Sequence, residues 1–217
     1  MYCPHTHTHT VPHTDTGFGA ALWLACGVPP LYTEPSPPNG SDSTARPTGT
    51  DPSQVVVDAL TAFYDEANGF NWETDTNWKT TAGFCEWYGV VCENGKVVGL
   101  YLDENNMYGS ISTMIGLLTD LVNIDVESNY LSGPIPTEVG NLSNLRRFEA
   151  DSNKLTGSIP SEFYNIKDLK EIYLQLNEFT GPVPEELCLR RIDMGGELDT
   201  LIVDCDIGCT CCSGCIT

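Results

Sequence analysis

Acidic and aromatic side chains recur at a constant interval of 24 residues in the middle of this chain. One series consists of Tyr101, Asp125, Glu149 and Tyr173, and a second of Asp103, Glu127, Asp151 and Gln175. Carboxylates at this density could bind a cationic partner, either a basic protein or peptide or a polyamine, or they could hold calcium between oxygen ligands. They could equally form a solvated acidic surface that keeps the protein soluble.

Motifs for catalysis are missing from the sequence. It contains no nucleophile elbow, H-E-x-x-H helix, phosphate loop or kinase signature. The four histidines, His5, His7, His9 and His13, all precede residue 14, so the rest of the chain lacks the commonest general base and metal ligand. Paired-carboxylate glycosidase chemistry needs a cleft, which an exposed repeat surface does not provide. We therefore expect no enzymatic activity.

Ten cysteines in a chain of 217 residues indicate an oxidising compartment. Six of them are concentrated near the C-terminus: Cys188, Cys205, Cys209, Cys211, Cys212 and Cys215. The sequence leaves their connectivity open. A C-x-x-C within this group could be a zinc or thiol-redox site, but no helix N-terminus, βαβ unit or histidine accompanies it. We favour a disulfide-stapled end of the domain.

Composition narrows the class of partner. Thirty acidic against ten basic residues give a formal net charge of −20. We expect no nucleic-acid partner, because phosphate binding needs a basic face, and an anionic membrane surface is disfavoured for the same reason. N-glycosylation acceptor patterns at Asn39 and Asn141 fit a secretory route.

The same 24-residue period defines the elements that position the acidic side chains. The repeated line is L-x-L-x-x-N-x-L-x-G-x-I-P, and its asparagines are Asn105, Asn129, Asn153 and Asn177. Because one coil cannot bury its own apolar edge, the coils must stack into a solenoid with a continuous core. The asparagine side chain carries a donor and an acceptor, and we interpret it as a structural group that satisfies buried backbone at each turn.

Each repeat contributes a strand whose alternate side chains point to solvent. The two acidic series therefore form ladders on one concave face, with about 5 Å between neighbouring strands. Like charges in such ladders destabilise the sheet and raise carboxylate pKa values, and Arg147 offers partial relief on one strand. Tyr101 and Tyr173 are amphipathic residues of the kind enriched at binding surfaces.

A helical cap is predicted before the first repeat, where an open solenoid end would expose apolar surface. Asp51 suits the N-cap, Pro52 the first helical position and Gln54 a capping box. Residues 55–64 supply an apolar stripe, and Asn68 with the following glycine ends the helix. Three tryptophans are interpreted as cap core rather than as a ligand cage: Trp72, Trp78 and Trp87.

The L-x-G-x-I-P segment after each asparagine resembles the plant-type leucine-rich repeat of receptor-kinase ectodomains and polygalacturonase-inhibiting proteins. The cysteine-dense end after Leu201 is similar to that of cysteine-tailed algal repeat proteins. The resemblance implies a second short sheet beside the concave one, and a disulfide between Cys85 and Cys92 within C-x-W-x-G-V-x-C. Segments that resemble the family's N-terminal cap are residues 59–64, 68–72, 77–78 and 85–92.

The predicted fold is α/β: a right-handed leucine-rich-repeat solenoid with a parallel concave β-sheet, a helical N-terminal cap and a Cys-rich C-terminal cap. Four segments are predicted: 1–50, a disordered Thr/Pro/His-rich leader; 51–95, the N-terminal cap; 96–187, four leucine-rich repeats; and 188–217, the Cys-rich C-terminal cap. The next strand after Asn177 arrives about five residues late, which marks the start of that last cap.

The leader contains an apolar run at residues 17–28. Its length suits a signal-peptide h-region and is too short to span a bilayer, although no positive n-region precedes it. A targeting or anchoring segment, an unprocessed or mispredicted leader, and a core helix all remain open. Removal of Cys3 and Cys26 with the leader would leave an even number of cysteines. The histidines could hold a transition metal, but a disordered Thr/His tract is favoured.

The sequence thus predicts a non-catalytic extracellular or cell-surface module without a full-length transmembrane helix or a required cofactor. It would bind a protein or peptide, of basic character, through the acidic concave face. The alternatives are an acidic structural component of a cell wall or matrix and an inhibitor of a secreted hydrolase. The sequence does not predict an oligomeric state.

Overall fold

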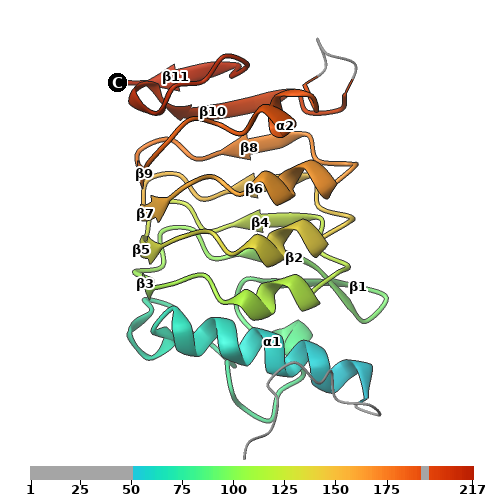
Figure 1. The fold of residues 1–217 in the computed structure, drawn as a ribbon. Helices are drawn as coiled ribbons and strands as arrows, with labels where there is room; N and C mark the ends of the chain where they lie inside the picture. Colours follow the sequence, from blue (N-terminus) through green and yellow to red (C-terminus); the bar gives the residue numbers. More distant parts are fainter. Residues whose placement is uncertain (1–50, 192–195) are drawn as a thin grey trace, which may run out of the picture. The chain divides into compact units, whose positions relative to one another are not determined.

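The computed structural model describes residues 51–191 and 196–217. Within these residues, seven strands form one sheet in the order β1-β2-β4-β6-β8-β10-β11 (Figure 1). Their bounds are β1 Val90–Glu93, β2 Lys96–Tyr101, β4 Asn123–Asp125, β6 Arg147–Glu149, β8 Glu171–Tyr173, β10 Thr200–Asp204 and β11 Gly214–Ile216. All neighbouring pairs are parallel except the β1–β2 hairpin. The predicted solenoid with a parallel sheet is confirmed.

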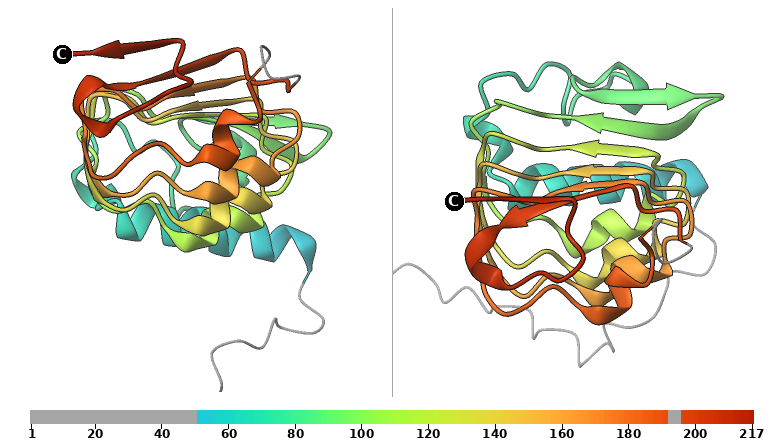
Figure 2. Two further views of the ribbon diagram at one scale, coloured as in Figure 1. Left: turned by 45° about the horizontal axis from the view of Figure 1, so that its top comes forward. Right: turned by 90° about the horizontal axis from the view of Figure 1, so that it is seen from above.

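A second sheet follows the asparagine of each coil. Its described strands are β3 Tyr108–Gly109, β5 Tyr130–Gly133, β7 Lys154–Gly157 and β9 Glu178–Phe179. Each coil is completed by a short 3-10 helix: η3 Thr113–Leu117, η4 Thr137–Asn141 and η5 Ser161–Asn165. These helices stack on one another and on α1 (Pro52–Glu66), on the side of the coils opposite the larger sheet (Figure 2). The outward side of the larger sheet, called the strand face below, therefore carries no helix among the described elements.

The core is a set of columns in register from coil to coil. Leu100, Ile124, Phe148 and Ile172 are paired in sequence along the sheet and are at most 3% exposed. Glycine recurs after each asparagine because φ is positive there, at Gly109, Gly133, Gly157 and Gly181. Gly109 is also closely packed against the cap. Its φ is +106°, and a Cβ there would lie 2.1 Å from the carbonyl oxygen of Glu66. Only glycine allows this close approach of the first coil to the cap helix.

From Asn129 onward, each repeated asparagine joins the backbone of its own coil to that of the preceding coil. Asn129 Oδ1 accepts hydrogen bonds from the backbone amides of Asn105 at 3.0 Å and Met107 at 2.9 Å. Its Nδ2 donates to three backbone carbonyl oxygens. Asn153 and Asn177 each donate to three equivalent carbonyl oxygens. Their Oδ1 atoms accept from the amides of Leu131 and Leu155, respectively. Each asparagine thus satisfies buried backbone groups at a turn where the chain leaves the sheet.

The N-terminal cap begins as the sequence indicates. Asp51 is the N-cap of α1, and its side chain accepts a hydrogen bond from the Ser53 amide. The capping box is wrong in one respect: Gln54 donates to Asp58 Oδ1 one turn later instead of returning to Asp51. The helix ends at Glu66, and Asn68 adopts the left-handed conformation that turns the chain.

The three cap tryptophans are core residues, as predicted, and are at most 7% exposed. The Trp78 ring lies 5.0 Å from both the Trp72 and the Trp87 ring, measured between centroids. Each indole N–H donates to a backbone carbonyl oxygen, so no buried donor is left unpaired in this cluster.

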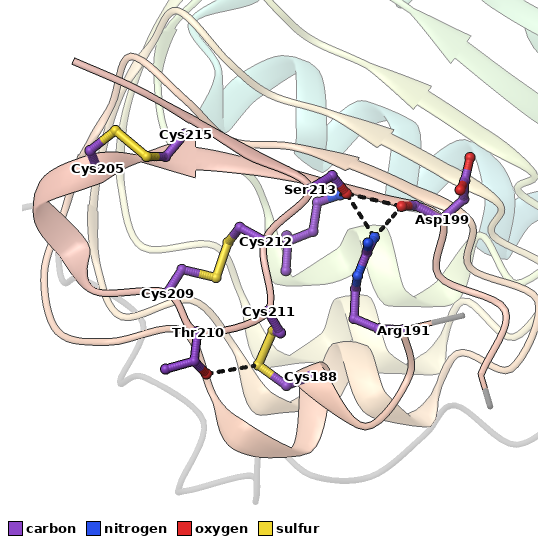
Figure 3. The surroundings of a disulfide bond; sticks show 11 residues. Cys188, Arg191, Asp199, Cys205, Cys209, Thr210, Cys211, Cys212, Ser213 and Cys215 are labelled. Atoms are coloured by element: carbon purple, nitrogen blue, oxygen red, sulfur yellow. Dashed lines mark hydrogen bonds between the residues drawn. A yellow bond between two sulfur atoms is a disulfide. The ribbon is translucent and has the colours of Figure 1, made fainter. Parts of the chain in front are cut away.

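The C-terminal cap is cross-linked by disulfides. The structure joins Cys188 to Cys211, Cys205 to Cys215 and Cys209 to Cys212, around α2 (Glu185–Cys188), η7 (Cys205–Ile207) and β11 (Figure 3). In the N-terminal cap, Cys85 is bonded to Cys92. Leu201 pairs with Ile172 after a spacing of 29 residues, the 24-residue period lengthened by five, as the delayed strand predicted.

Several predictions lie outside the described residues: those on the histidine tract, the apolar run at 17–28, Cys3, Cys26 and Asn39. The proposed segment boundaries remain predictions. None of the helices in the described part is long and apolar enough to cross a membrane.

Candidate binding surface

The structure brings the two predicted series together on the strand face. In the first series, Tyr101 pairs with Asp125, Asp125 with Glu149, and Glu149 with Tyr173. The second series follows directly after the strands. There the backbone amides of Glu104, Ser128 and Ser152 donate to the carbonyl oxygens of Glu127, Asp151 and Gln175, respectively. Both series therefore run in register along the solenoid axis.

Exposure varies within this surface. Tyr101 and Asp103 are exposed, whereas Asp125, Glu127, Asp151, Tyr173 and Gln175 are half-buried. Glu149 is only 9% exposed, so it lies mostly beneath its neighbours rather than open to a partner. Gln175 turns its Oε1 out of solvent, without a hydrogen-bond partner in the described part of the chain.

Arg147 explains how a carboxylate can be buried here. Its Nη2 lies 2.6 Å from Glu149 Oε1, and its Nε lies 3.3 Å from Glu171 Oε2. Its guanidinium also lies over the Tyr173 ring, 5.4 Å from the centroid. The sequence interpretation named Arg147 as a partial counter-charge but missed Glu171. The 24-residue spacing between them was the available signal, because it pairs these two residues across β6 and β8.

Three carboxylates at the centre of the strand face have raised pKa values: Asp125, Glu127 and Glu149. Burial, followed by the charges of Asp151, Asp125 and Glu149, raises the pKa of Glu127 to about 7. Burial also raises the pKa of Asp125 and of Glu149, and Arg147 opposes both shifts. The centre of the strand face therefore holds more negative charge than it can stabilise alone, and a bound cationic group would relieve it.

The calcium alternative gains no support from side-chain placement. Within residues 51–191 and 196–217, no three Asp, Glu, His or Cys side chains are grouped so that they could hold a metal ion. Two surface hollows, of about 330 and 750 Å³, lie away from the strand face. The first lies between α1 and the β1–β2 hairpin, and the second is lined by prolines of the L-x-G-x-I-P segments.

Comparisons with known proteins agree with this architecture. The Leucine Rich Repeat family model matches residues 144–166. The chain is similar to the receptor-like kinase TMK4 of Arabidopsis thaliana, with 32% identity over 72 residues that cover 33% of the chain and 8% of the kinase. The fold and these matches show a leucine-rich-repeat solenoid, and the predicted resemblance to plant receptor kinases is confirmed.

Two solved ectodomains from Arabidopsis thaliana share the fold. That of the receptor kinase GASSHO1/SCHENGEN3, in complex with Casparian strip integrity factor 2, is 27% identical with a TM-score of 0.56. The match covers 74% of this chain and 18% of that one. The BIR2 ectodomain is 24% identical with a TM-score of 0.58, over 68% of this chain and 80% of that one. The chain thus spans a small part of TMK4 and of GASSHO1/SCHENGEN3 but most of the BIR2 ectodomain.

Proposed function

We propose that the chain is a non-catalytic extracellular recognition module that binds a basic protein or peptide ligand through the strand face. The observation that carries the proposal is the uncompensated negative charge at the centre of that face. Arg147 is the one basic side chain on β4, β6 and β8, and it is already engaged by Glu149 and Glu171. The charges of Asp125 and Asp151 near Glu127 therefore remain available to a partner.

The similar proteins support a binding role. The GASSHO1/SCHENGEN3 ectodomain was solved with another factor bound, and it shares both fold and 27% sequence identity with this chain. Four disulfides in the described residues, together with the likeness to ectodomains, support an extracellular or cell-surface location. Because the chain covers a small part of TMK4 and of GASSHO1/SCHENGEN3, the proposal includes no kinase or signalling activity.

The proposal is tested by calorimetric titration of the full chain with a lysine-rich peptide at low and high salt. We expect heat of binding at low ionic strength and at least about tenfold weaker binding at 1 M salt, where the Debye length falls to about 3 Å. The double variant Glu127→Lys and Asp151→Lys should abolish binding. Glu178→Lys makes the same type of change on β9, outside the strand face, and serves as the control. Binding that survives the double variant, or no binding by the unmodified chain, would sink the proposal.

A further inference from the structure

The strand face is extended by β1, a strand that the repeat pattern does not include. Val91 pairs with Gly99, so its side chain lies on the same side of the sheet as Tyr101, two residues after Gly99. The Tyr101 ring covers Gly99, where an added Cβ would lie 2.6 Å from Tyr101 Cε2 and 3.3 Å from Val91 Cβ. Val91 is 44% exposed and Tyr101 39%. These two side chains give the N-terminal end of the face a continuous apolar surface.

Apolar side chains also mark the opposite end. Ile202 pairs with Tyr173 across β10 and β8, and Ile216 pairs with Asp204 across β11 and β10. Leu201 and Val203 on β10 are fully buried. Because successive side chains of a strand point to opposite sides, Ile202 and Asp204 point outward onto the strand face. The face therefore ends in apolar groups on strands supplied by the C-terminal cap.

Leu176 is a third apolar residue at this end. It is 52% exposed and has a φ of +58°, and its amide donates to Asp204 Oδ1 at 2.7 Å. The three preceding coils place polar residues at the equivalent position: Glu104, Ser128 and Ser152. A leucine held in a left-handed conformation and exposed to solvent is unfavourable by itself. Burial against a partner would offset that cost.

Acidic groups occupy the centre between the two apolar ends. Asp125 and Glu127 belong to the coil of β4, and Glu149 and Asp151 to the coil of β6. Seven strands about 4.8 Å apart span about 29 Å, and an extended chain that rises about 3.3 Å per residue covers this distance with about nine residues. Figure 2 shows the sheet free of helices on this side.

We propose that the strand face binds an extended peptide segment of about nine residues, with bulky apolar side chains near both ends and basic side chains in the middle. This inference rests on the proposed function and specifies its ligand. The basic centre follows from charge complementarity, and the apolar ends follow from the exposed side chains of β1, β11 and Leu176. A second copy of the chain fits poorly, because both copies carry the net charge of −20.

Three synthetic nine-residue peptides test the proposal by calorimetry on the full chain. The first has lysines in the centre and leucine at both ends, the second replaces the leucines with serine, and the third keeps leucine ends around a glutamate centre. We expect the first peptide to bind about tenfold more tightly than the second, which corresponds to about 50 Å² of newly buried apolar surface. The third should not bind detectably.

Two variants test which residues of the chain contact the leucine ends of the peptide. Val91→Ser and Leu176→Ser should each reduce the preference for leucine ends about threefold, while the affinity for the serine-ended peptide stays constant. Leu189→Ser is the matched control, because Leu189 is 56% exposed beyond α2 and away from the strand face. Melting temperatures check that all variants remain folded.

The outcomes separate the two proposals. If neither lysine peptide binds, the proposed function fails and this inference fails with it. If both lysine peptides bind equally, or the preference for leucine survives both variants, only the inference is overturned. Binding of the glutamate peptide, or self-association of the chain that the leucine-ended peptide does not disrupt, would also overturn it.

Discussion

Arg147 and Glu149 form an ion pair from the same side of one strand, with 2.6 Å between Nη2 and Oε1. The two residues are separated by Phe148, which points into the core and is 1% exposed. The arginine side chain remains 45% exposed and covers the carboxylate, whose side chain is only 12% exposed. A charge buried in this way depends on its partner, because removal of the cation leaves an uncompensated carboxylate.

Replacement Arg147→Met should therefore destabilise the fold by about 1–2 kcal/mol at pH 7.5. The loss should shrink at pH 4, because burial already raises the pKa of Glu149 and protonation removes the unpaired charge. Urea unfolding at both pH values measures the effect. Combining Arg147→Met with Glu149→Gln should recover most of the loss at pH 7.5. An equal loss at both pH values, without recovery, would contradict the assigned role of the ion pair.

Glu127 predicts a pH dependence of stability with a definite sign. Its pKa is about 7 in the folded chain, above the ordinary value of 4.5, because of burial and neighbouring carboxylates. Between these values the folded state binds a proton that the unfolded state has lost, so stability falls as the pH rises from about 4.5 to 7. We expect Glu127→Gln to raise the melting temperature at pH 8 and to leave it unchanged at pH 4.

Glu178→Gln is the control for this measurement, since Glu178 is exposed on β9. The control should not reproduce the gain at pH 8. If Glu127→Gln lowered the melting temperature at pH 8, the crowding of like charges on the strand face would not be a source of instability.

Replacement of Asn129 tests whether the repeated asparagines stabilise the fold. The variant Asn129→Ala leaves the amides of Asn105 and Met107 without their acceptor and removes a donor to three carbonyl oxygens. At about 1–3 kcal/mol for each buried group left unpaired, the loss should exceed about 3 kcal/mol. Asn165→Ala, at an exposed position in η5, should cost less than about 0.5 kcal/mol. Similar urea midpoints for the two variants would contradict the structural role.

The success of these sequence predictions follows from the repeat itself. One 24-residue period corresponds to one coil, so a residue and its equivalent in the next repeat are neighbours in the sheet. Tyr101 lies beside Asp125 for this reason, and the buried column from Leu100 to Ile172 follows in the same way. The positions of residues within the coils can be predicted without the structure of the caps, because every coil contacts mainly its neighbours.

The 24-residue period predicts neither the structure of the two caps nor the packing of side chains within the repeats. Val91 joins the strand face through an antiparallel hairpin that has no equivalent in the repeats. The connectivity of the C-terminal cysteines depends on a chain path with no internal periodicity. The burial of Glu149 depends on side-chain packing with Arg147, which alternation along a strand does not describe.

Asn141 is expected to carry an N-linked glycan when the chain passes through a eukaryotic secretory pathway. It begins an acceptor pattern completed by Ser143, and both residues are exposed at the end of η4, on the helical side of the coils. Peptide N-glycosidase should reduce the mass of the secreted chain, and Ser143→Ala should remove that part of the change. Because η4 lies away from the strand face, deglycosylation should not alter peptide affinity. An unmodified Asn141 in the secreted chain would contradict the prediction.

Two C-terminal disulfides should differ in their effect on stability because they close loops of different length. Cys188 and Cys211 are separated by 23 residues, whereas Cys209 and Cys212 are separated by three. A longer loop restricts the unfolded chain more, so the double replacement of Cys188 and Cys211 by serine should cost about 1.5 kcal/mol more than that of Cys209 and Cys212. Urea unfolding under non-reducing conditions compares the two variants, and mass spectrometry after thiol alkylation checks that the remaining pairs are unchanged. In the structure, the Cys188–Cys211 disulfide links α2 to the segment before β11. If its loss cost no more stability than the loss of Cys209–Cys212, with the remaining pairs intact, contacts in the folded state would outweigh the restriction of the unfolded chain.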